Sequence, residues 1–139
     1  MRSELRAVLD TNVLESAVLQ EKSVLGACLR RIVEAGTLLL SRDVLLEYAN
    51  VLMRPKLDRF VDRSLRTEIL LKLVAECEPV FIRRRFRVRR DPNDDKFLEL
   101  AANGNAGFLV TGDADLASIG EFRGVPIVSP QVFLDRTED

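Results

Sequence analysis

Short apolar runs alternate with amphipathic stretches along almost the whole chain, and this alternation constrains the fold more than any other feature. Runs of four or five residues, several of them closed by a polar turn, have the length of buried strands. They are Arg6–Asp10, Thr37–Leu40, Pro79–Ile82, Gly107–Thr111 and Val125–Val128. Strands separated by helices form a parallel sheet with helices on both faces. We therefore predict a single α/β domain spanning residues 1–139.

Helix boundaries are marked by capping residues, glycine and proline. Ser41 is placed to cap a helix over Arg42–Met53, which should end before Pro55 because the residue preceding a proline resists the helical region. Ser129 and Pro130 mark the start of a last helix that runs through Leu134. The other expected helices are Val13–Leu19, Ser23–Glu34 closed by Gly36, Lys56–Val61, one capped by Ser64 and running to Cys77, one capped by Asn93 or Asp94 and running to Ala102, and Ala114–Ile119.

Histidine is absent, and this excludes Ser-His-Asp relays, Cys-His relays and histidine-containing zinc sites. Cys28 and Cys77 stand apart in apolar surroundings, which indicates core cysteines of a reducing compartment. The chain has 47% apolar and 31% charged residues, no apolar run long enough for a membrane span, and no signal peptide at its start. We expect a soluble cytoplasmic protein whose hydrolytic chemistry would use carboxylates, lysine or an oxygen-ligated metal.

Two acids follow predicted strands. Asp10 ends the first strand, and Asp113 lies just beyond the strand that ends at Thr111. In open parallel sheets, ligands bind outside the carboxyl ends of the strands, so both acids should emerge at the same edge. Gly112 allows a sharp turn there, and Asp115 follows two residues after Asp113.

Two helical acids can join them. Glu47 lies beside the apolar stripe of its helix, and Asp95 lies in the first turn of a later helix at the margin of its buried face. Four converging carboxylates would repel one another unless a hard divalent cation such as Mg²⁺ bound among them. Each acid alone has a commoner explanation as a turn, cap or surface residue, and Asp91, Asp94 and Asp115 are expected to be of that ordinary kind.

Five segments occur in a diagnostic order: LDTNVL at 9–14, Glu47 within its helix, DPNDDKFLELA at 91–101, LVTGDADL at 109–116 and VPIVSPQVFL at 125–134. Together they resemble PIN domains, and most closely the toxin components of toxin–antitoxin pairs akin to VapC. The similarity covers about residues 6–134. It implies metal ligation by Asp10, Glu47, Asp95 and Asp113, with Asp115 as a candidate fifth acid.

The resemblance also implies an activity and partners. In such enzymes one or two Mg²⁺ or Mn²⁺ ions position a water for attack on an RNA phosphodiester, which would make this chain an endoribonuclease. It implies that Asn12 holds the site by hydrogen bonding near the first aspartate and that Thr111 supports the last acids. A homodimer and a separately encoded antitoxin that blocks the acidic pocket are further expectations.

Residues 83–90, RRRFRVRR, hold six of the chain's 21 Lys and Arg residues and none of its 22 acids, although PIN relatives often carry few charges here. One interpretation is a phosphate-binding strip for RNA beside the site. A second is contact with an acidic partner. A third is an edge strand whose charges prevent aggregation, with Phe86 and Val88 on one apolar face. The arginines concerned are Arg83, Arg84, Arg85, Arg87, Arg89 and Arg90.

Other α/β proteins also place an aspartate at the end of the first strand. A haloacid-dehalogenase-like phosphatase would need a second aspartate two residues later, where this chain has Asn12. A phosphoacceptor receiver domain would need a lysine after a late strand, where Gly112 and Asp113 stand instead. The alternative that stays open is a catalytically silent PIN-like module that binds RNA or a protein.

Overall fold

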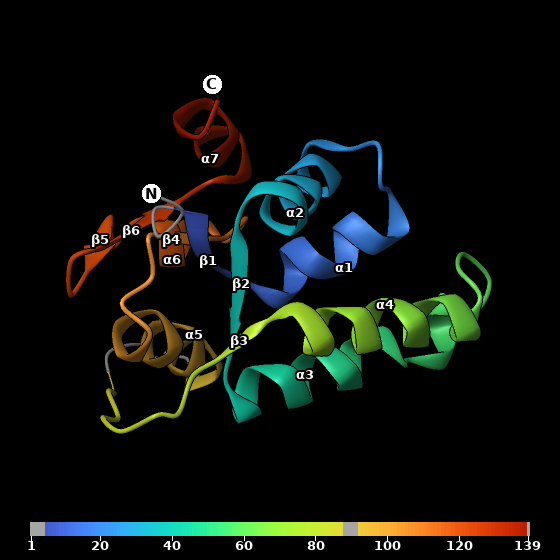
Figure 1. Cartoon of the computed structure of the whole chain (residues 1–139), viewed down its shortest axis with the longest axis horizontal. Coiled ribbons are helices and arrows are strands. Elements are labelled where there is room, and N and C mark those ends of the chain that lie inside the picture. Colours follow the sequence, from blue (N-terminus) through green and yellow to red (C-terminus); the bar gives the residue numbers. More distant parts are fainter. Residues whose placement is uncertain (1–4, 88–91, 139) are drawn as a thin grey trace.

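A six-stranded sheet forms the centre of the protein in the computed structural model, which describes residues 5–87 and 92–138 (Figure 1). The strand order is β3-β2-β1-β4-β6-β5. All neighbours pair in parallel except β5, which is antiparallel to β6. The strands are β1 (Arg6–Leu9), β2 (Thr37–Leu40), β3 (Glu78–Pro79), β4 (Phe108–Val110), β5 (Glu121–Phe122) and β6 (Val125–Val128). The predicted α/β class is therefore confirmed, and the antiparallel edge strand β5 was not predicted.

Helices cover both faces of the sheet. Helices α2 and α7 pack on one face, and α4 and α5 pack on the other. The helices are α1 (Thr11–Leu19), α2 (Val24–Ala35), α3 (Arg42–Leu52), α4 (Arg63–Glu76), α5 (Pro92–Asn103), α6 (Ala114–Ala117) and α7 (Pro130–Arg136), with a 3₁₀ turn η2 (Pro55–Leu57). Within the described ranges, none of these helices has the length and apolar character needed to cross a bilayer.

Two of the predicted caps are present, and two are displaced. Ser41 and Ser129 accept hydrogen bonds from the first-turn amides of α3 and α7, as expected. Helix α4 begins at Arg63, so its N-cap residue is Asp62 and not Ser64. Helix α5 begins at Pro92, whose fixed φ suits the first helical position. Asn93 and Asp94 therefore lie inside the first turn of α5 and do not cap it.

The strand order reverses beside β1. The chain runs outward from β1 through β2 to β3 and then returns to β4 on the other side of β1. Leu9 is in register with Val110, so these two strands end side by side. The residues that follow them, Asp10 and Thr111, lie at the point where open α/β sheets bind ligands.

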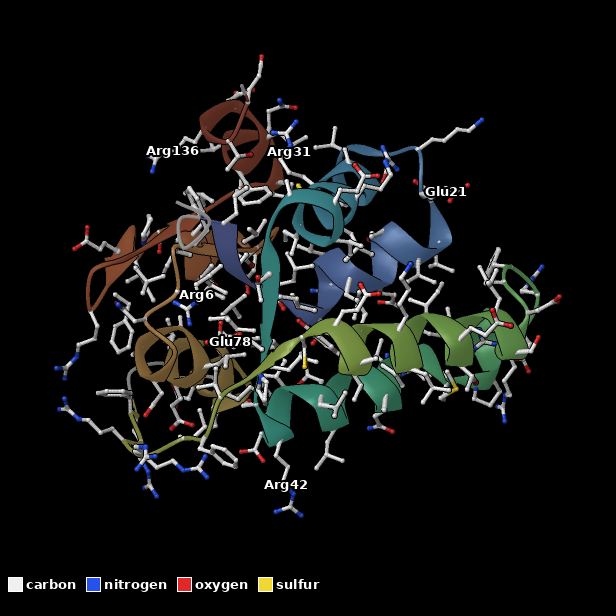
Figure 2. All side chains as sticks on the ribbon, in the orientation of Figure 1. Arg6, Glu21, Arg31, Arg42, Glu78 and Arg136 are labelled. Atoms are coloured by element: carbon white, nitrogen blue, oxygen red, sulfur yellow. The ribbon has the colours of Figure 1, made fainter. Side chains whose placement is uncertain are left out.

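The opposite, amino-terminal end of the sheet is fastened by an ion pair. The Arg6 guanidinium at the start of β1 donates to both carboxylate oxygens of Glu78 in β3, with Nε–Oε1 at 3.0 Å (Figure 2). It also donates to the carbonyl of Gly104 after α5. These contacts hold the ends of α5 and β3 against β1, away from the edge where Asp10 lies.

The predicted strand Pro79–Ile82 is shorter and earlier than expected. Glu78–Pro79 is in register with β2 and the Val80 amide still donates to the carbonyl of Leu40, but residues 80–87 form no strand. The edge-strand interpretation of the arginine run is therefore wrong for residues 83–87. Val88, Arg89 and Arg90, together with Asp91, lie outside the described residues.

The two cysteines are free thiols. Cys28 is fully buried in the core, and Cys77 is half-buried against it. Burial raises the pKa of the Cys28 thiol to about 11. Both positions agree with the prediction that these residues are structural.

Candidate active site

Asp10 and Thr111 join the ends of β1 and β4. The Thr111 hydroxyl donates a 2.7 Å hydrogen bond to Oδ2 of Asp10, and the Asp10 amide donates to the carbonyl of Val110. The same hydroxyl accepts a hydrogen bond from the amide of Asp113 at 3.0 Å. Thr111 thus links the first and last acids of the predicted site, and its contact with the first was not foreseen.

Asp10 is a buried carboxylate, only 7% exposed. Burial raises its pKa, and the negative charge of Glu47 adds to this effect. Hydrogen bonds from the Thr111 hydroxyl and from the amides of Asn12 and Thr11 act in the opposite direction. No lysine or arginine of residues 5–87 or 92–138 forms an ion pair with Asp10. A buried carboxylate without a cation is costly, so this position favours the binding of one.

Helix α3 brings Glu47 to the same place. Val44, Tyr48 and Leu52 form its buried stripe, and the Tyr48 hydroxyl donates to the carbonyl of Leu9 at the end of β1. Glu47 lies at the margin of this stripe, as predicted, with 24% of its side chain exposed.

The carboxylate of Glu47 has two partners. Its Oε2 accepts a hydrogen bond from the Thr11 hydroxyl, and its Oε1 lies 2.6 Å from Nζ of Lys96 in α5. Neither Thr11 nor Lys96 was predicted. Thr11 could have been found from its place directly after Asp10 at a strand end, whereas Lys96 carried no comparable signal.

Of the remaining predicted residues, Asp113 and Asn12 line the cleft, whereas Asp115 does not. Asp113 is half-buried at the N-cap of α6, where its Oδ1 accepts a hydrogen bond from the Asp115 amide at 2.9 Å. Asp115 itself is exposed and points no carboxylate into the cleft that Asp113 lines. Asn12 is exposed and lines that cleft, and among the described residues its side chain forms no hydrogen bond. Its amide, and not its side chain, acts on Asp10.

Helix α5 directs Asp94, and not Asp95, into the cleft. Asp94 lines the same cleft as Asp10, Glu47 and Asp113, whereas Asp95 lines a neighbouring groove. Adjacent residues of a helix are rotated by about 100° from each other, so one position decides which side of α5 an acid occupies. Asp95, the acid of α5 that was predicted for the site, therefore lines the neighbouring groove, and its role as a ligand stays a prediction.

The cleft is an open cavity of about 1130 Å³ with an acidic lining. Lys96 and Arg54 are its basic lining residues in the part of the chain that the structure describes. The acidic residues that line it are Asp10, Glu15, Asp43, Glu47, Asp94 and Asp113. Six carboxylates against two cations make this a region of negative potential.

The acids of the cleft do not form a closed metal cage. Among residues 5–87 and 92–138, no three carboxylate, histidine or cysteine side chains are arranged to hold a metal ion by themselves. Glu47 is turned toward Thr11 and Lys96, and Asp113 toward the amide of Asp115. The donor set still fits a hard cation such as Mg²⁺ or Mn²⁺, because the cleft offers carboxylate oxygens and no lysine or arginine of the described residues pairs with the buried Asp10.

A sequence model described as "PIN domain" matches residues 6–115. The chain belongs to the PIN-domain family. It is also 30% identical over 121 residues to the uncharacterized protein MJ1680 of Methanocaldococcus jannaschii, with 84% of this chain and 76% of that protein covered. The haloacid-dehalogenase-like and receiver alternatives are thereby set aside.

Two solved structures share the fold of this PIN domain. PAE2754 from Pyrobaculum aerophilum superposes with a TM-score of 0.63 at 16% identity, over 96% of this chain and 89% of that one. VapBC2 from Rickettsia felis, solved bound to a DNA fragment from its promoter, superposes with a TM-score of 0.59 at 15% identity, over 88% of this chain and 97% of that one.

The arginine segment, residues 83–87, lies along the other side of α5 in this PIN domain. Asn103 accepts hydrogen bonds from the amides of Arg83 and Arg84 at 2.9 and 3.0 Å. Glu99 accepts the amide of Phe86 at 2.9 Å and pairs with Arg85 at 3.1 Å. The backbone of the segment is therefore bonded to side chains of α5, which explains why it forms no strand. The role of Glu99 was not predicted, although its spacing of four from Asp95 and Asn103 places all three in one row.

Proposed function

We propose that this PIN domain is a metal-dependent endoribonuclease in which Asp10, Glu47, Asp94 and Asp113 are the metal ligands. The observation that carries the proposal is the buried Asp10 carboxylate, which lies in an acidic cleft without a cationic partner among the described residues. Membership in the PIN-domain family supports nuclease chemistry at this position.

The chemistry divides between a cation and the chain. When bound, Mg²⁺ or Mn²⁺ supplies an activated water and neutralises charge on the phosphodiester. Thr111 fixes the orientation of Asp10, and Thr11 fixes that of Glu47. Lys96 and Arg54, the basic residues that line the cleft, would contact the phosphate oxygens of an RNA strand.

The biological setting we propose is the toxin of a toxin–antitoxin pair in the cytoplasm. The fold is similar to that of the Rickettsia felis VapBC2 structure, whose name denotes such a pair. A separately encoded antitoxin would then cover the acidic cleft, and a homodimer is the proposed assembly. Both proposals rest on similarity. Co-purification of the chain with the product of a neighbouring reading frame tests the antitoxin, and the molar mass of the purified chain in solution tests the homodimer.

The second candidate is a catalytically silent module that binds RNA or a protein. The ion pair between Lys96 and Glu47 favours it, because a lysine already neutralises one of the proposed metal ligands. Incubation with labelled RNA distinguishes the two candidates, because the nuclease cleaves RNA and the silent module only binds it.

The decisive experiment is cleavage of end-labelled RNA by the purified protein in Mg²⁺, Mn²⁺ or a chelator. Asp10→Asn and Asp113→Asn are expected to slow cleavage by about a thousandfold or more, because the loss of metal-ion stabilisation is worth several kcal/mol. Asp135→Asn, an exposed acid on α7, is the matched control and should cleave like the wild type. RNA binding without cleavage by every protein, in every metal, would replace the nuclease with the silent module.

Protein stability provides a second, independent readout. Because burial raises the pKa of Asp10, its ionised form disfavours the folded state, and this cost grows as the pH rises above the ordinary value of 3.8. In a chelator at pH 7, Asp10→Asn should therefore unfold at the same or a higher temperature than the wild type. Mn²⁺ should raise the unfolding temperature of the wild type but not of the variant. A variant that is less stable in the chelator would mean that Asp10 has a cationic partner in the fold.

A further inference from the structure

Two phenylalanines and two arginines form a cluster beside α5, which we call the arginine–phenylalanine platform: Arg84, Phe86, Phe122 and Arg123. The rings of Phe86 and Phe122 meet edge to face, with centroids 5.3 Å apart. The Arg84 guanidinium lies 5.4 Å and that of Arg123 4.7 Å from the centroid of Phe86. The arginine segment and the β5–β6 hairpin are far apart in the sequence. Each contributes one phenylalanine ring and one guanidinium group to this cluster.

The platform is held in place by contacts on both sides. Asn103 bonds to the amide and the carbonyl of Arg84, and Glu99 bonds to the amide of Phe86. Arg123 occupies the left-handed region at φ 53°, next to Gly124 at φ 84°, in the tight turn between β5 and β6. Both guanidinium groups therefore extend from fixed backbone, which lowers the entropy cost of binding a ligand.

The charges of the platform are not neutralised within the described chain. Arg6 and Arg85 each pair with a glutamate, whereas no carboxylate of residues 5–87 or 92–138 pairs with Arg84 or Arg123. If the platform only packed the arginine segment against the β5–β6 hairpin, the two phenylalanine rings would be sufficient. Two exposed guanidinium groups stacked on rings match instead the groups that bind bases and phosphates.

Of the platform residues, Phe86 lines a second groove of about 420 Å³, which adjoins the acidic cleft. Phe86 and Arg87 line this groove, and it shares Asp43 and Lys96 with the cleft. A strand bound in the cleft can therefore extend past Lys96 toward the platform. The negative cleft repels a phosphate chain, so cations beside it would supply the affinity that the cleft lacks.

We infer that the arginine–phenylalanine platform is a subsite for single-stranded RNA that holds the nucleotides next to the one in the acidic cleft. The inference rests on the proposed function. Bases stack on the guanidinium planes that the phenylalanine rings support, and the outer guanidinium nitrogens bind phosphate oxygens. Duplex RNA, whose bases are already stacked, would gain little from the platform.

The test measures RNA binding in a chelator, where no cleavage occurs. Fluorescein-labelled 12-nucleotide oligouridine and a 12-base-pair RNA duplex are titrated with the wild type, with Arg84→Met/Arg123→Met and with Phe86→Leu. Arg59→Met/Arg136→Met is the charge-matched control. Arg59 also lies over a phenylalanine, and Arg136 lies on α7 (Figure 2), whereas the platform arginines lie on the arginine segment and the β5–β6 turn. Circular dichroism confirms that each variant is folded.

The arginine double variant should bind oligouridine at least about tenfold more weakly, and its salt dependence should fall by about 1.4 logarithmic units per decade, because two phosphate contacts are lost. Phe86→Leu, which keeps every charge, should weaken binding by about fivefold or more. The control should stay within about twofold of the wild type, as expected for a surface substitution.

Equal oligouridine affinity in all four proteins would overturn the subsite and leave the nuclease proposal intact if RNA is still cleaved in Mn²⁺. The subsite would also be overturned if the arginine double variant bound RNA as the wild type does but no longer bound a 12-residue polyglutamate peptide. The platform would then be assigned to an acidic protein. Weakened RNA binding by the variants, with no cleavage by the wild type, would support the subsite and reject the nuclease.

Discussion

The acidic cleft and the arginine segment each bury one carboxylate to the same extent, since Asp10 and Glu99 are both 7% exposed. Glu99 has a full set of partners in the Arg85 guanidinium and the Phe86 amide. Asp10 has a hydroxyl and backbone amides but no cation within the described residues. The comparison shows that burial alone does not mark a functional acid. What distinguishes Asp10 is a charge at an open cleft that no lysine or arginine of residues 5–87 or 92–138 neutralises, where a ligand can reach it.

Helix α5 joins these two regions. One side carries Asp94 and Lys96 into the cleft, and a row of residues spaced by four lies toward the arginine segment. That row is Asp95, Glu99 and Asn103. A negative cleft and a positive segment therefore lie next to each other because a single helix separates them.

The two sides of α5 should differ most in catalysis. Asp94→Asn is expected to slow metal-dependent cleavage by about 100-fold or more, because it removes a charge that faces the cation and the phosphodiester. Asp95→Asn, the matched substitution one residue later, should stay within about threefold, the range of a surface change. Rates of cleavage of a labelled RNA in Mn²⁺ give both values. A larger loss of cleavage rate for Asp95→Asn than for Asp94→Asn would mean that Asp95, and not Asp94, is the ligand on α5.

The sequence predicted the sheet and most of its edge. Apolar runs of strand length are local features, and so are capping serines such as Ser41 and Ser129, which is why both were placed correctly. Asp10 and Asp113 were expected at one edge from the rule for parallel sheets, and Glu47 was expected to join them from the margin of its helix's apolar stripe. All three line one cleft.

What the sequence did not show depends on contacts between residues that are far apart in the chain and on which side of a helix each residue occupies. Which of the adjacent acids Asp94 and Asp95 lines the cleft depends on how α5 packs against the sheet, and Asp95 was chosen from its place at the margin of the buried face. The arginine segment was given an edge strand as one interpretation, because nothing local shows that Asn103 and Glu99 satisfy its amides. Lys96 was missed for the same reason, since its partner Glu47 is 49 residues away.

Removing the charge of Glu99 should lower the free energy of unfolding, whereas removing that of Asp10 should not. Glu99→Gln is expected to lower the free energy of unfolding by about 1–3 kcal/mol, because it removes a charge-assisted hydrogen bond and an ion pair. Asp10→Asn should not lower it in a chelator, as argued from the raised pKa of Asp10. Urea denaturation at pH 7 measures both. Glu34→Gln, an exposed glutamate of α2, is the control and should change the free energy by less than about 0.5 kcal/mol.

The same substitution should loosen the arginine segment. Tryptic cleavage after the arginines of residues 83–87 should become faster in Glu99→Gln than in the wild type, because the Phe86 amide and Arg85 lose their anchor on α5. Unchanged proteolysis together with unchanged stability would show that Asn103 alone holds the segment, and the contrast between the two carboxylates would then fail.

The smallest expected effect concerns Lys96, which lies between the two regions and lines both cavities. Its ammonium group neutralises Glu47 from 2.6 Å, and both side chains are 24% exposed. A pair of this exposure is worth up to about 1 kcal/mol, so its removal should raise the affinity for Mn²⁺ by no more than about fivefold. Isothermal titration of Mn²⁺ into Lys96→Met measures this, with Lys72→Met on α4 as the exposed control. A tighter Mn²⁺ complex would mean that Lys96 stands where the cation binds and must move aside from Glu47. Unchanged affinity would place the cation on Asp10, Asp94 and Asp113 without Glu47, which would remove one of the four proposed ligands.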